Sequence, residues 1–174
     1  MSIYKGRTVV FLALALLFFL IRCDAYGEEA ERKIINVVSD TMEVDSDRKL
    51  ITFSGDVVAK EDFLVCSERL YIHYTGRDEV KQMIAEGNVR IVQGQKGAKG
   101  DRAVYNRDKR VVVITGSAEA IECGDMVKGD KITLYLDTND VLVEADSDGR
   151  VRATIMPEKK ECKEVSAGEV LGCP

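Results

Sequence analysis

Apolar residues alternate with polar residues along most of this 174-residue chain. In "KLITFSGDVVAK" one face would carry Ile51, Phe53, Val57 and Ala59, and "RLYIHY" and "KITLYL" show the same period of two. Such alternation is typical of β-strands with one buried face. Because no segment within residues 32–155 has a convincing helical period, the sequence predicts an all-β protein.

The strand pattern is also repeated. The stretch "ITFSGDVVAKE" at 51–61 returns as "VITGSAEAIE" at 113–122. Four glycines that each stand two residues before Val or Ala mark the repeat: Gly55, Gly87, Gly116 and Gly149. A period of about 31 residues indicates stacked units that bury their apolar faces against each other.

Clusters of Asp, Asn, Ser and Gly separate the strand patterns and supply the residues that tight turns need. They lie at 44–49, 74–79, 105–110, 136–141 and 145–150. These hairpin turns favour an antiparallel sandwich over a parallel β-helix. We expect "QGQKGAKGD" at 93–101 to be a flexible Gly/Lys loop that joins the two halves.

The two ends of the chain differ from this pattern. Lys5 and Arg7 precede an apolar run of 13 residues, 9–21, which is followed by small residues, as in a secretory signal. A membrane-spanning helix needs about 20 apolar residues. We therefore expect a signal peptide over 1–25, with cleavage at 25 to 27, and an uncleaved anchor is the alternative. The polar residues 158–174 are predicted to form a loose, cysteine-containing tail.

Four of the five cysteines lie outside the predicted signal: Cys66, Cys123, Cys162 and Cys173. In an oxidising compartment, Cys162 could pair with Cys173 and Cys66 with Cys123, although four cysteines allow three pairings and the sequence does not choose. Alternatively, Cys66 and Cys123 are small buried apolar residues. No CxxC spacing supports a metal site.

The sequence contains few residues or motifs that are typical of a catalytic site. His73 is the only histidine, and no nucleophile or metalloprotease motif accompanies it. We therefore predict that the chain is not an enzyme and needs no cofactor. A net charge of −5 disfavours binding to nucleic acid. What remains is an exported β protein whose extended apolar faces either line a groove for a long apolar ligand or close into a dry core.

Four stretches resemble the OstA-like proteins of lipopolysaccharide transport: "SDTMEVDSDRKLITFSGDVVA" (39–59), "YNRDKRVVVITGSAEA" (105–120), "KGDKITLYL" (128–136) and "ADSDGRVRATIMP" (145–157). The resemblance implies a twisted open antiparallel β-jellyroll over residues 32–157, located in the periplasm of a Gram-negative cell. It also implies an interior that receives the lipid A acyl chains of lipopolysaccharide. Its open edges would pair with LptC-like and LptD-like jellyrolls and with further copies, head to tail, in a bridge from inner to outer membrane.

The alternation and the resemblance together select candidate lipid-binding residues. Those on the repeated faces are Ile51, Phe53, Val57, Val112, Ile114, Ala118 and Leu134. The resemblance adds Ile35, Val37 and Tyr105. For each of them, packing in an ordinary core is the alternative.

Two further readings of the whole chain stay open. One is a membrane-anchored, LptC-like component of the same pathway, and the other is an exported β filament protein without a lipid ligand. Lys96 and Lys99 could meet lipid phosphates or simply be solvated.

Overall fold

The computed structural model describes residues 35–60, 63–76, 79–145 and 149–156. The chain divides into two units, residues 1–32 and 33–174, and every described residue belongs to the second. The predicted signal peptide at 1–25 and the tail at 158–174 lie outside the described residues. Within the described part, no helix is long and apolar enough to cross a membrane.

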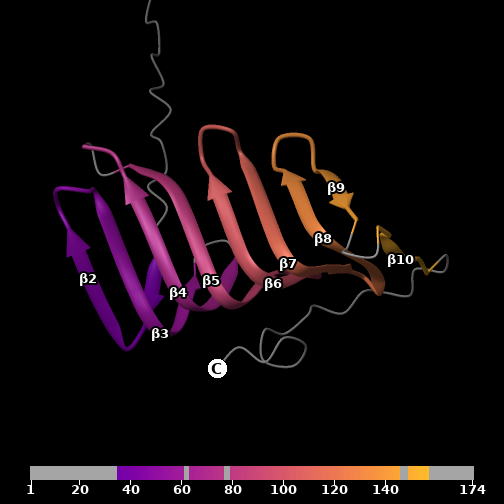
Figure 1. Ribbon diagram of the computed structural model, residues 1–174, viewed down its shortest axis with the longest axis horizontal. Helices are drawn as coiled ribbons and strands as arrows, with labels where there is room; N and C mark the ends of the chain where they lie inside the picture. Colours follow the sequence, from indigo (N-terminus) through magenta and orange to yellow (C-terminus); the bar gives the residue numbers. More distant parts are fainter. Residues whose placement is uncertain (1–34, 61–62, 77–78, 146–148, 157–174) are drawn as a thin grey trace, which may run out of the picture. The chain divides into compact units, whose positions relative to one another are not determined.

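The described residues form one antiparallel sheet of ten strands (Figure 1). The strands are β1 (Asn36–Val38), β2 (Thr41–Asp45), β3 (Leu50–Lys60), β4 (Leu64–Tyr74), β5 (Val80–Gln93), β6 (Lys96–Asn106), β7 (Val111–Glu122), β8 (Asp125–Tyr135), β9 (Asp140–Glu144) and β10 (Arg152–Thr154). From β3 to β8 each strand pairs with the next one along the chain. The prediction of an all-β, open antiparallel fold is confirmed. Four of the five predicted hairpin turns join strands that pair with each other, whereas 145–150 joins β9 and β10, which both pair with β8.

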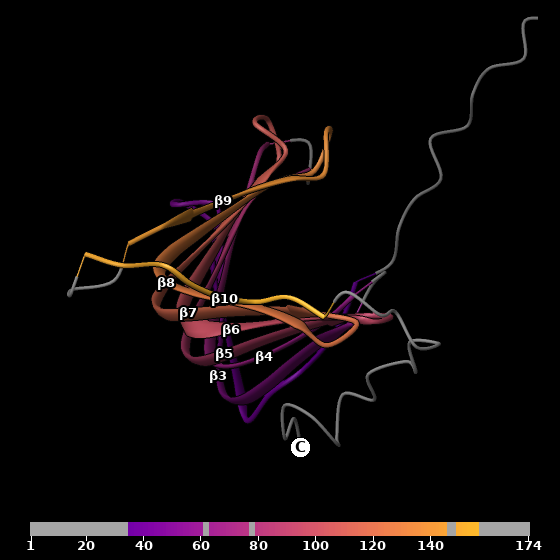
Figure 2. The same ribbon diagram turned by 90° about the vertical axis from the view of Figure 1, so that its right-hand side faces the viewer.

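Each long strand bends near its middle, so that the sheet has two arms facing each other across an interior (Figure 2). The arm that contains β2 and β9 is called the β2 arm below, and the arm that contains β1 and β10 is called the β1 arm. The bend coincides with a register shift in every pairing from β3 to β8. A row of β-bulges therefore crosses the sheet, and bulges are the usual means of bending a strand.

Three of the four repeated glycines make these bulges. Gly55, Gly87 and Gly116 have φ values of 83°, 80° and 78°, and the residue after each also has a positive φ. L-residues with a side chain rarely adopt this conformation. The fourth glycine, Gly149, lies between β9 and β10, where the chain passes from one arm to the other.

The short strands at the ends of the sheet follow the same plan. β1 and β2 both pair with β3, and β9 and β10 both pair with β8. β1 and β2 together thus occupy the place of one bent strand that is interrupted at the bend, and β9 and β10 do the same at the other end of the sheet. The repeat seen in the sequence is therefore a bent strand followed by its hairpin partner.

The prediction of a loop at 93–101 is wrong. Only residues 94 and 95 form the turn, because β6 begins at Lys96. Gly97 is buried within β6. Gly100 lies against β7, where an added Cβ would come within 2.6 Å of Ile114 Cγ2 and 2.9 Å of the Thr115 carbonyl oxygen. Gly100 therefore allows β6 to pack closely against β7. The Gly/Lys composition of the stretch alone resembles that of a flexible loop.

Candidate functional site

Successive rows of apolar side chains cross the inner face of the sheet. In the β2 arm, the register aligns Phe53, Leu70, Ala85, Ala103, Ile114 and Ile132 in one row. In the β1 arm, a second row consists of Val37, Ala59, Val65, Ile91, Ala98, Ala120 and Val127. All of these side chains belong to, or pack against, a single hydrophobic cluster. The two arms therefore share one continuous apolar interior.

Most of the candidate residues from the sequence belong to this interior. Phe53, Val57, Ile114 and Ala118 are buried in the cluster, with 8%, 1%, 4% and 1% of their surface exposed. Val37, Ile51, Tyr105 and Val112 are half-buried and pack against it. Leu134 is half-buried and pairs with Val112 in the register. Ile35 is half-buried and precedes β1, outside the rows that the register defines.

The sequence analysis missed other members of the same interior. These are Leu70, Ile72, Met83, Ala85, Val89, Ala103 and Ile132. The alternation in "RLYIHY" already placed Leu70 and Ile72 on one face, and the register adds that this face joins the repeated faces of β3 and β7.

At both ends of the sheet, the last side chains in the apolar rows of the inner face are exposed to solvent. At the β2 end, Met42 pairs with Phe53 and Val44 pairs with Ile51, yet Met42 and Val44 are 58% and 53% exposed. At the other end, Val141 continues the row of Leu134 and is 53% exposed. Ile155, which follows β10, is 73% exposed. The apolar interior is therefore open at both ends, beside strands that, within the described part of the sheet, have a pairing partner on one side only.

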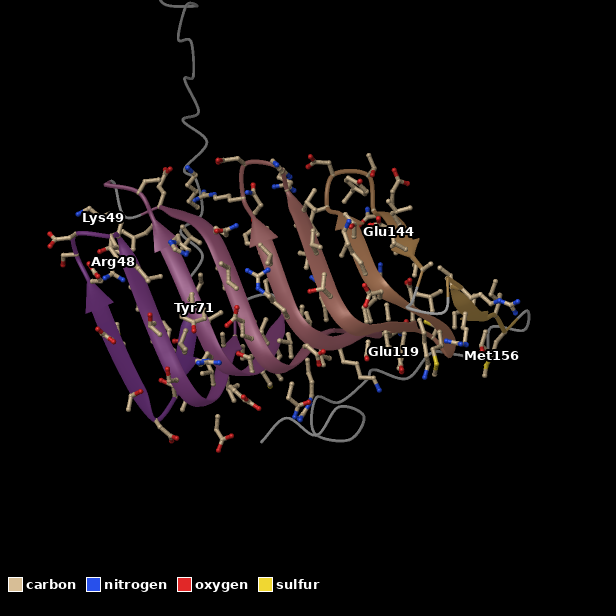
Figure 3. All side chains as sticks on the ribbon, viewed as in Figure 1. Arg48, Lys49, Tyr71, Glu119, Glu144 and Met156 are labelled. Atoms are coloured by element: carbon tan, nitrogen blue, oxygen red, sulfur yellow. The ribbon has the colours of Figure 1, made fainter. Side chains whose placement is uncertain are left out.

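The outer face of the β1 arm carries charges. The Glu119 side chain on β7 is 9% exposed and lies between two lysines, with its Oε2 at 2.8 Å from Lys128 Nζ and 3.3 Å from Lys99 Nζ (Figure 3). Burial alone would raise the pKa of Glu119, but the hydrogen bonds and charges of Lys128 and Lys99 outweigh it and hold that pKa below the ordinary 4.5. Lys96 forms an ion pair with Glu122 at 3.5 Å. Lys96 and Lys99 thus lie in a strand and contact carboxylates of β7.

The described residues bring together no catalytic or metal-binding cluster. No group of three or more His, Cys, Asp or Glu side chains among them is placed to hold a metal ion. His73 is half-buried in β4, on the face opposite to Leu70 and Ile72. The feature of the described part that could serve a ligand is the apolar interior with its open ends.

Comparisons with known proteins agree with this architecture. Residues 36–140 match the family model described as "LptA/(LptD N-terminal domain) LPS transport protein". The lipopolysaccharide export system protein LptA of Escherichia coli K12 is 23% identical over 141 residues, which are 74% of this chain and 74% of that protein. LptA of Shigella flexneri gives the same values.

A solved structure has the same fold. The crystal structure of LptH, described as the LptA homologous periplasmic component of the lipopolysaccharide transport device of Pseudomonas aeruginosa, matches with a TM-score of 0.65 at 18% identity. The match covers 72% of this chain and 96% of LptH. With the family model covering more than half of its length, this chain belongs to the LptA/LptD N-terminal family of lipopolysaccharide transport proteins.

Proposed function

We propose that this protein is exported to the periplasm and carries lipopolysaccharide in its apolar interior, as one unit of a bridge between the inner and outer membranes. The observation that carries the proposal is an apolar interior shared by two arms and exposed at both ends, at Met42 and Val44 on one side and Val141 on the other. A closed, dry core would end in polar residues at these positions. Family membership supports the same role.

Moving a lipid through water without such an interior costs a large free energy. Exposing apolar chains to water costs about 0.8 kcal/mol per CH₂, so one acyl chain of about a dozen carbons faces roughly 10 kcal/mol. A continuous apolar path removes most of this barrier. The lining would consist of the candidate residues on the inner rows, among them Phe53, Val112 and Ile114. The arms would have to separate for a lipid to enter, because the central residues pack tightly against each other.

The end strands would serve assembly. β1, β2, β9 and β10 are short, and each pairs with one other strand among those the structure describes. The other side of each could add a strand from another chain. Pairing there with LptC-like or LptD-like jellyrolls, or with another copy head to tail, would extend the inner rows from one unit into the next. The exposed Met42, Val44 and Val141 would then be covered at the junctions.

The test is co-elution of the exported, purified protein with lipopolysaccharide on a sizing column at two protein concentrations. We expect bound lipid in the wild type and in Lys131→Ala, because Lys131 is a partly exposed residue outside the hydrophobic cluster. Ile114→Asp should lose the lipid, since a carboxylate in the interior repels acyl chains.

Circular dichroism must show that each variant is folded. Equal lipid binding by folded Ile114→Asp and Lys131→Ala would remove Ile114 from the lipid path. Concentration-dependent oligomers without bound lipid would instead support the filament reading. The N-terminal residue of the exported protein separates the two lipid-pathway readings: a start at residue 26 to 28 supports a bridge unit, and an intact Met1 supports an anchored, LptC-like component.

A further inference from the structure

Two side chains on the outer face of the β1 arm are buried although they do not belong to the inner hydrophobic cluster. Cys66 on β4 and Val92 on β5 are 3% and 6% exposed. Their chain neighbours Val65 and Ile91 take part in the inner cluster. Because side chains alternate along a strand, Cys66 and Val92 point to the opposite face. All described strands lie within the single sheet, so none of them covers this face.

Cys66 and Cys123 are both disulfide-bonded, but they cannot be bonded to each other. The register places Cys66 level with Glu119, three strands away on β7. Three strand spacings amount to about 14 Å, and the four residues from Glu119 to Cys123 add about 13 Å along the chain. A disulfide joins Cα atoms that are at most about 7 Å apart.

The remaining cysteines are Cys23, Cys162 and Cys173, and Cys23 lies in the predicted signal peptide. The last described residue, Met156, lies close to the residues that follow Cys123. The Met156 N–H donates a hydrogen bond to Asp125 Oδ1 at 2.7 Å, and a Cβ on Gly124 would come within 2.9 Å of Met156 Sδ. Figure 3 shows Met156 at this end of the sheet.

We propose that the C-terminal segment 157–174 crosses the outer face of the β1 arm and is fastened there by two disulfides, Cys123–Cys162 and Cys66–Cys173. Cys162 follows Met156 by six residues, a reach of at most about 20 Å. That reach is ample for Cys123, whereas Cys66 would require a nearly straight chain. The eleven residues from Cys162 to Cys173 span up to about 36 Å, more than the distance between Cys123 and Cys66.

The composition of the segment fits this face. One outer row of the β1 arm contains Arg90, Lys99, Glu119, Lys128 and Arg152, four basic residues and one acidic residue. The segment 157–174 contains four glutamates and three lysines. Val170 and Leu171, close to Cys173, supply apolar side chains to cover Val92. The inner face stays available to a ligand, because the segment occupies the opposite face.

Each bond forms when two thiols lose two protons and two electrons to a dithiol–disulfide oxidant of the exported compartment, which is reduced to its dithiol. Trypsin separates the four cysteines into different peptides, 61–69, 111–128, 161–163 and 164–174. The experiment is mass spectrometry of the full exported chain, digested without reduction after free thiols have been blocked. We expect 61–69 linked to 164–174 and 111–128 linked to 161–163. Any other linkage, or a blocked free thiol in one of these peptides, would overturn the proposal.

Single serine variants provide a second, matched measurement. In Cys173→Ser, a maleimide should label Cys66 without denaturant and leave Cys123 unlabelled. In Cys162→Ser, the labelling pattern should be the reverse. Labelling of Cys123 in Cys173→Ser, or of neither cysteine, would contradict the assigned pairing. Neither measurement depends on lipid, so the result stands whether or not the protein carries lipopolysaccharide.

Discussion

Replacing Gly116 by alanine should strongly destabilise the fold, because the bend in β7 depends on this residue. Its φ of 78° costs an L-residue about 1–2 kcal/mol. An added Cβ would also lie 2.3 Å from Asp101 Oδ2 and 2.7 Å from Asp101 Cβ, and relieving such crowding costs about 1–3 kcal/mol. Alanine also lowers the conformational entropy of the unfolded chain, which stabilises the protein by about 0.4–1 kcal/mol, so we expect a net loss of about 1–4.5 kcal/mol.

Three comparisons separate the contributions. At Gly94, with φ of 56° and nothing within 4 Å of an added Cβ, alanine should cost only the backbone term, about 0–1.5 kcal/mol. At Gly76, where φ is outside the positive range and the space is open, alanine should leave stability unchanged or slightly raised. Combining Gly116→Ala with Asp101→Gly removes every Asp101 side-chain atom that crowds the added Cβ, so the two changes should couple by about 1–3 kcal/mol.

The assay is urea unfolding followed by circular dichroism, with the midpoint and the slope both measured. An unchanged slope with a lower midpoint is the expected signature of lost native stability. If Gly116→Ala unfolds within about 0.5 kcal/mol of the wild type, or if Asp101→Gly shows no favourable coupling with Gly116→Ala, the account of the bend is refuted.

Three further predictions concern the outer face, the open ends and the interior. Because the pKa of Glu119 is lowered, its charged form stabilises the fold above pH 4.5, and this stabilisation is lost as the pH falls through the folded-state pKa. In urea titrations, Glu119→Gln should therefore lower the unfolding free energy by about 1 kcal/mol at pH 7 and leave it unchanged at pH 2. Glu122→Gln, which alters the more exposed pair with Lys96, is its control and should show less than about 0.5 kcal/mol at either pH. Val44→Glu should change monomer stability by less than about 0.5 kcal/mol but weaken self-association measured by sedimentation, and unchanged association would exclude this end as a contact. Ile132→Ala, at a position 2% exposed in the interior, should lower the unfolding free energy by about 2–5 kcal/mol, and a loss below about 1 kcal/mol would show a loosely packed interior.

The strands and their faces could be predicted from the sequence because a period of two fixes which side chains share a face. The placement of Ile51, Phe53 and Ile114 on apolar faces agrees with the structure for this reason. The bend could not be predicted, since the extra residue of each bulge is defined only by the register with neighbouring strands. Gly55 and Gly116 were recognised as repeat markers, but their positive φ is a property of that register.

Two other features were beyond sequence reasoning for similar reasons. Gly97 and Gly100 suggest a loop by composition. Only the pairing of Gly97 with Ile121 and the close approach of Gly100 to Ile114 show that this stretch belongs to the sheet. The exposure of Met42 and Val141 depends on which strands are last in the sheet. The alternation identifies them as apolar positions and does not tell whether another strand covers them.

Photocrosslinking at two adjacent valines tests the central claim most directly. Val112 and Val113 on β7 are both half-buried, but Val112 packs against the inner cluster and Val113 points to the outer face. A benzophenone amino acid is introduced at each position in turn, and the folded protein is irradiated with lipopolysaccharide. The account predicts a lipid adduct at Val112 and none at Val113. Equal adducts at both positions, or an adduct at Val113 alone, would contradict a lipid path through the interior.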